Sequence, residues 1–107
     1  MTDKLSLHLL AIGYHPEIMQ VLHRLMNSHS GWHGTIALSL EEGLQQLTEY
    51  PYDGVLLGVG VTPEDEAIIR AAIEKQELFT RIIRHYGGGS GLLENEVRAE
   101  FENLQQQ

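Results

Sequence analysis

Apolar residues in this chain gather in short runs that alternate with longer stretches where they recur every three or four positions. The short runs predict strands and the spaced stretches predict amphipathic helices, because side chains repeat every 2 residues on strands and every 3.6 on helices. The expected strands are Leu5 to Ile12, Thr35 to Leu38, Asp53 to Val59 and Arg81 to Tyr86. A helix is expected after each strand, so the order β-α-β-α-β-α-β-α predicts a parallel sheet with right-handed crossovers.

The first three expected helices each have a start signal. Pro16 suits the first turn of the first helix, where its missing N–H costs nothing. Ser39 with Glu42 forms a capping box at the second, and Thr62 caps the third ahead of a proline and acidic residues. These helices are expected to end near Asn27, Pro51 and Gln76. The four apolar stripes are Ile18, Val21, Leu22, Leu25 and Met26; Leu40, Leu44 and Leu47; Ile68, Ile69, Ala72 and Ile73; and Leu93, Val97, Phe101 and Leu104.

The length and charge narrow the possible classes of protein. A chain of 107 residues fits a single α/β domain over residues 1–107. The formal net charge of −8 disfavours nucleic acid and anionic membrane surfaces as partners. There is no cysteine for a disulfide or thiolate site, and neither a signal peptide nor a membrane-spanning run is recognisable. We therefore expect a cytoplasmic protein.

Three segments give the chain a family resemblance. Residues 9–18 are similar to the first strand and turn of response-regulator receiver domains. Leu40 to Leu44 is similar to the second helix of that family, and Tyr52 to Leu57 is similar to its third strand. The resemblance covers roughly residues 5–86 and rests on pattern rather than on catalytic residues. It implies a flavodoxin-like, three-layer α/β sandwich with a four-stranded parallel sheet in the order 2-1-3-4.

The family's catalytic residues are missing at the matching positions. The Mg²⁺-binding acids are replaced by Gly13 and Tyr14, and the phosphoacceptor aspartate by Gly58. Only one helix is expected after the fourth strand, so we do not expect the family's fifth strand and its lysine. Phosphoryl transfer to a carboxylate needs the carboxylate, a metal and a nearby cation. The resemblance therefore implies a degenerate receiver that cannot be phosphorylated at the usual site.

The carboxyl ends of the strands form the expected crevice, because ligands of open α/β sheets bind there. Exposed backbone N–H groups and a helix start near Ser90 favour a small anionic ligand. A flexible turn around the glycines is the alternative interpretation. The candidate ligand-binding residues are Gly13, Tyr14, His15, Gly58, Gly60, His85, Tyr86, Gly87, Gly88, Gly89, Ser90 and Gly91.

The glycine-rich run from Gly87 to Gly91 matches no known type of catalytic loop. It lacks the lysine of a P-loop and the third glycine of a dinucleotide fingerprint. Gly88 to Leu92 also fails as a nucleophile elbow, because Leu92 takes the place of the last glycine. No cofactor is expected.

Six histidines raise the question of a metal site. His8 is expected within a strand in a core or half-buried role, and His33 at the opposite edge from the crevice. His15 and His85 are the only two expected to be neighbours, and two imidazoles without a third ligand do not make a zinc site. No metal site is therefore expected.

The leading hypothesis is a non-catalytic signalling or regulatory module that acts through a protein partner, with a homodimer as one form. It could also bind an anionic ligand at the glycine-rich loop. The alternative is a small enzyme, a hydrolase or one acting on phosphate esters, that uses His15 or His85 with Tyr14 or Tyr86.

Overall fold

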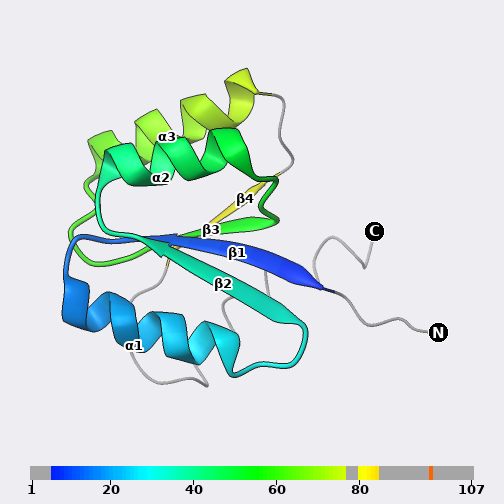
Figure 1. The fold of residues 1–107 in the computed structure, drawn as a ribbon. Coiled ribbons are helices and arrows are strands. Elements are labelled where there is room, and N and C mark those ends of the chain that lie inside the picture. Colours follow the sequence, from blue (N-terminus) through cyan, green and yellow to red (C-terminus); the bar gives the residue numbers. More distant parts are fainter. Residues whose placement is uncertain (1–5, 77–79, 85–96, 98–107) are drawn as a thin grey trace.

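The computed structural model describes residues 6–76, 80–84 and 97, and they form a sheet with helices on both faces (Figure 1). Helix α1 covers one face, and α2 and α3 cover the other. All neighbouring strands are parallel, in the order β2-β1-β3-β4, which confirms the predicted α/β fold and strand order. The elements are β1 (Leu7–Ile12), α1 (Pro16–Asn27), β2 (Trp32–Ala37), α2 (Leu40–Glu49), β3 (Gly54–Leu57), α3 (Pro63–Lys75) and β4 (Arg81–Arg84).

Alternate residues of the central strands contribute their side chains to two separate hydrophobic cores, one on each face of the sheet. Leu9 and Ala11 of β1 pack with α1, while Leu10 and Ile12 pack on the face that carries α2 and α3. All four of these side chains have no solvent exposure, as expected for a strand covered on both faces. Val97 is also buried, in the cluster on the α1 face. Leu93, Phe101 and Leu104 of the expected last helix lie outside the described residues.

The expected helix starts are confirmed by their hydrogen bonds. Ser39 Oγ accepts from the backbone N–H of Glu42 at 3.1 Å, and Thr62 Oγ1 accepts from that of Asp65 at 3.1 Å. Helix α1 has an additional cap, because Nδ1 of His15 accepts from the N–H of Ile18 at 3.3 Å. None of the described helices is long and apolar enough to cross a membrane.

Several local predictions were wrong. Strand β3 runs only from Gly54 to Leu57, whereas Asp53 to Val59 was expected. Strand β2 begins at Trp32 and ends at Ala37, whereas Thr35 to Leu38 was expected. The structure pairs all six of its residues with β1 although Gly34 is a poor strand former. On α1, Met19 is buried while Ile18 and Val21 are 43% and 49% exposed. Ile68 of α3 is likewise 46% exposed. In both helices, the face that packs on the sheet is therefore rotated relative to the predicted apolar stripe.

Candidate functional site

The carboxyl edge of the sheet brings together the predicted site residues that the structure describes. Gly13 N–H donates to the Ala37 carbonyl at 3.1 Å, and Gly58 N–H donates to the Ile12 carbonyl at 2.8 Å. The N–H of Tyr14 donates to the Val59 carbonyl at 2.8 Å. These three donors are therefore used within the fold and are not presented to a ligand.

The side chain of Met19 fills the space between Gly13, which follows β1, and Gly58, which follows β3. A Cβ atom added at Gly13 would lie 2.5 Å from the Met19 sulfur, and one added at Gly58 would lie 3.2 Å from the same atom. The thioether thus occupies the space between Gly13 and Gly58. This part of the edge is apolar, and Gly13 itself is buried.

Tyr14 closes the edge on the α3 side. Its ring packs over Gly60, where an added Cβ would lie 3.1 Å from Tyr14 Cδ2. The φ angle of Gly60 is +93°, so both the close contact and the backbone conformation favour glycine at this position. The phenol donates to Oδ2 of Asp65 at 2.8 Å. Burial, helped by the bond to Asp65 and its charge, raises the pKa of Tyr14 to about 12. The neutral phenol therefore ties the β1–α1 loop to the first turn of α3.

The other half of the predicted site, residues 85–91, lies outside the described residues. His15 is exposed beside the carboxyl edge and already caps α1. Anion binding at this edge stays a prediction, and the three N–H donors of Gly13, Tyr14 and Gly58 contribute nothing to it.

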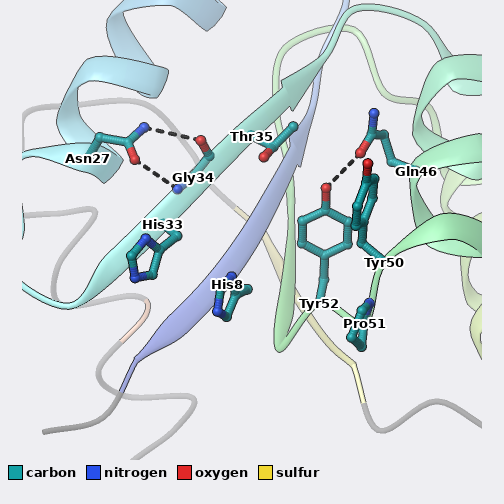
Figure 2. A pocket seen from close by; sticks show the side chains of 9 residues that line it. All are labelled: His8, Asn27, His33, Gly34, Thr35, Gln46, Tyr50, Pro51 and Tyr52. Carbon is teal, nitrogen blue, oxygen red and sulfur yellow. Dashed lines mark hydrogen bonds between the residues drawn. The ribbon is translucent and has the colours of Figure 1, made fainter.

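A pocket of about 530 Å³ lies at the opposite edge, near the amino ends of β1 and β2 and beyond the end of α2 (Figure 2). A pocket of this size falls within the range of small-molecule sites. It is lined by His8, Asn27, His33, Gly34, Thr35, Gln46, Tyr50, Pro51 and Tyr52.

Two histidines stack on one side of this pocket. His8 and His33 are directly paired in the parallel register of β1 and β2, so their side chains share a face. Their ring centroids lie 4.8 Å apart with an interplanar angle of 17°, and both side chains are exposed. Oγ of Ser6 lies 3.3 Å from Nε2 of His33.

This pair corrects the expectation that only His15 and His85 are neighbours. His8 is exposed rather than in a core or half-buried role. The pairing was missed because β2 was expected to begin at Thr35, which leaves His33 outside the sheet. Both histidines occupy the second position of their strands, so a strand beginning at Trp32 would have indicated the contact.

Tyrosines and an amide form the other side of the pocket. Tyr52 is 9% exposed, and its phenol donates to Oε1 of Gln46 at 2.7 Å. Burial raises the pKa of Tyr52, and a hydrogen bond with Thr35 acts in the opposite direction. Tyr50 meets Tyr52 edge to face, with centroids 6.3 Å apart and planes at 70°. The backbone carbonyl of Tyr52 also accepts from Thr80 Oγ1 at 2.7 Å, so hydrogen bonds hold both the side chain and the backbone of this residue.

Within the described part of the chain, no three or more His, Asp or Glu residues gather where they could hold a metal ion. Searches against models of known protein families and against curated proteins found no match to this chain. The class of protein is therefore defined by the fold, a parallel four-stranded α/β sheet consistent with the flavodoxin-like topology.

Proposed function

We propose that this protein is a degenerate receiver-like domain that acts as a non-catalytic binding module in signalling or regulation. The observation that carries the proposal is the Met19 sulfur between Gly13 and Gly58. The strand order β2-β1-β3-β4 supports the receiver-like part, because receiver domains share this arrangement of their first four strands.

The packing at Gly58 opposes phosphoryl transfer at the position of the family's acceptor. A Cβ at Gly58 would also lie 3.3 Å from the Ile12 carbonyl oxygen. An acidic side chain there would begin against a carbonyl oxygen and a thioether, neither of which stabilises negative charge. The nearby N–H groups of Gly58 and Tyr14 already donate to backbone carbonyls. The edge is therefore suited to holding the loops together rather than to binding Mg²⁺ and a phosphoryl group.

The exposed side of α1 supports action through a protein partner. Ile18 and Val21 are three residues apart, so they are neighbours on one helical face, and both are well exposed. Adjacent exposed apolar side chains are a feature of interaction surfaces. A second copy of this chain is the simplest partner.

Acetyl phosphate with Mg²⁺ tests the non-catalytic part of the proposal. We expect intact-protein mass spectrometry to show no phosphorylated species, while a receiver domain that retains its acceptor aspartate is labelled under the same conditions. A stable, hydroxylamine-sensitive phosphorylated form of this protein would overturn the proposal. Mapping the modification to an aspartate would then identify the unsuspected acceptor.

A further inference from the structure

We propose that the pocket at the amino ends of β1 and β2 binds a small, uncharged, planar heteroaromatic molecule. This site is separate from the carboxyl edge, and the inference does not depend on the proposed function. It rests on the rings, the polar groups and the charges of the residues that line the pocket (Figure 2).

The charges around the pocket favour a neutral ligand. None of its nine lining residues is a lysine, arginine, aspartate or glutamate. Two acidic groups interact with residues of the lining: Asp53, whose Oδ2 accepts from the N–H of His8 at 2.8 Å, and Glu49, whose charge acts on Tyr52. Together with the net charge of −8, these carboxylates oppose binding of an anion.

The rings of the pocket favour a flat ligand. Figure 2 shows His8 and His33 on one side and Tyr50, Pro51 and Tyr52 on the other. The exposed imidazoles are already stacked at 4.8 Å. Aromatic rings prefer offset-stacked or edge-to-face contacts at such separations, so a planar molecule can extend the stack and meet the tyrosines at the same time.

The polar groups favour acceptor atoms on the edge of the ligand. Because Oε1 of Gln46 accepts from Tyr52, the amide is oriented and its Nε2 remains as the donor end of the side chain. The hydroxyl of Thr35 is hydrogen-bonded to Tyr52, so it helps to hold that tyrosine rather than offering a donor to a ligand. A ring nitrogen or carbonyl oxygen of a heteroaromatic molecule matches the Gln46 donor.

One end of the pocket is held by hydrogen bonds within the fold. The Asn27 amide donates to the Gly34 carbonyl at 3.1 Å and accepts from the Gly34 N–H at 3.0 Å. It also donates to the His23 carbonyl at 2.8 Å, so it closes one end of the pocket and joins α1 to β2. A preformed pocket lowers the entropic cost of binding.

Titration with adenine, followed by amide chemical shifts in NMR spectra of the whole chain, tests the proposal. We expect saturable shifts at His8, His33, Thr35 and Tyr52, and no comparable shifts with cyclohexanecarboxamide, a saturated ring that carries an amide. His8→Ala with His33→Ala should weaken adenine binding by at least about tenfold, the scale of losing a stacking partner. His23→Ala, which removes an exposed histidine of α1 outside the pocket, should leave it unchanged.

Three results would overturn the proposal. The first is no saturable shift with millimolar adenine, and the second is equal binding of the saturated amide. The third is that inorganic phosphate or Zn²⁺ shifts these residues while adenine does not, which would assign the histidine pair to an anion or a metal. Thermal unfolding of the His8 and His33 variant separates loss of binding from loss of folding.

Discussion

Tyr14 organises the carboxyl edge of the sheet through one ring contact and one hydrogen bond. Its ring covers Gly60 and its phenol reaches Asp65 at the start of α3. The bond holds the β1–α1 loop to the first turn of α3 and requires the phenol to stay protonated. The stability of this edge therefore depends on the protonation of Tyr14.

Replacing Tyr14 with phenylalanine should cost about 1.5–3 kcal/mol at neutral pH, the range for a hydrogen bond to a charged group. The pKa of Tyr14 is raised from 10.0 to about 12. The neutral phenol's contribution is therefore complete below pH 10 and is lost as the pH rises through 12. Urea unfolding at pH 7, 10 and 12 should show a smaller alkaline loss for Tyr14→Phe than for the natural protein. Tyr50→Phe, at an exposed ring, is the control, and equal alkaline losses in both variants would contradict the assignment.

At the scale of elements, Asn27 ties the end of α1 to β2, the edge strand of the described sheet. An exposed edge presents unpaired N–H and C=O groups that can pair with another chain. The Asn27 amide meets both groups of Gly34, and the N–H of Trp32 donates to the His29 carbonyl at 3.1 Å. The helix thus protects the strand that follows it.

Asn27→Ala should destabilise the protein by about 0.5–1.5 kcal/mol, because it removes solvent-exposed hydrogen bonds whose Gly34 groups water can then satisfy. Hydrogen exchange at the Gly34 amide should become faster, while exchange within β3 follows only the change in global stability. Gln45→Ala is a matched control, since that amide bonds to Glu49 on its own helix. Unchanged exchange at Gly34 in Asn27→Ala would show that the amide does not protect the edge.

At the scale of the whole molecule, two opposing properties govern association. The net charge of −8 makes copies of the chain repel one another, while the exposed Ile18 and Val21 of α1 favour contact. Salt screens the repulsion but leaves the apolar contact intact. Self-association through α1 should therefore strengthen with ionic strength.

Light scattering across a range of protein and salt concentrations measures this association. We expect a dimer that forms more readily at high salt and is lost in Ile18→Glu. Ile68→Glu, a similar change on the exposed side of α3, should leave it intact. A monomer under all conditions, or equal loss in both variants, would rule out a homodimer through α1.

The order of elements and the strand order could be predicted because their signals are local. Buried runs such as Leu9 to Ile12, the cap at Ser39 and the cap with proline at Thr62 each act within a few residues. Right-handed crossovers then leave few ways to arrange four parallel strands. The glycines at positions 13 and 58 were likewise visible without any structure.

The side chains that occupy the two edges of the sheet could not be predicted in the same way. Met19 rather than Ile18 turns inward, and its sulfur fills the space left by two glycines more than 40 residues apart. His8 and His33 stack because β1 and β2 pair in one register, which local propensity at Gly34 did not indicate. Sequence alone therefore determined which elements form and in what order, because hydrogen bonding and periodicity act over short stretches. Helix rotation and strand register were decided only by tertiary packing, since they depend on how distant side chains fill a shared space.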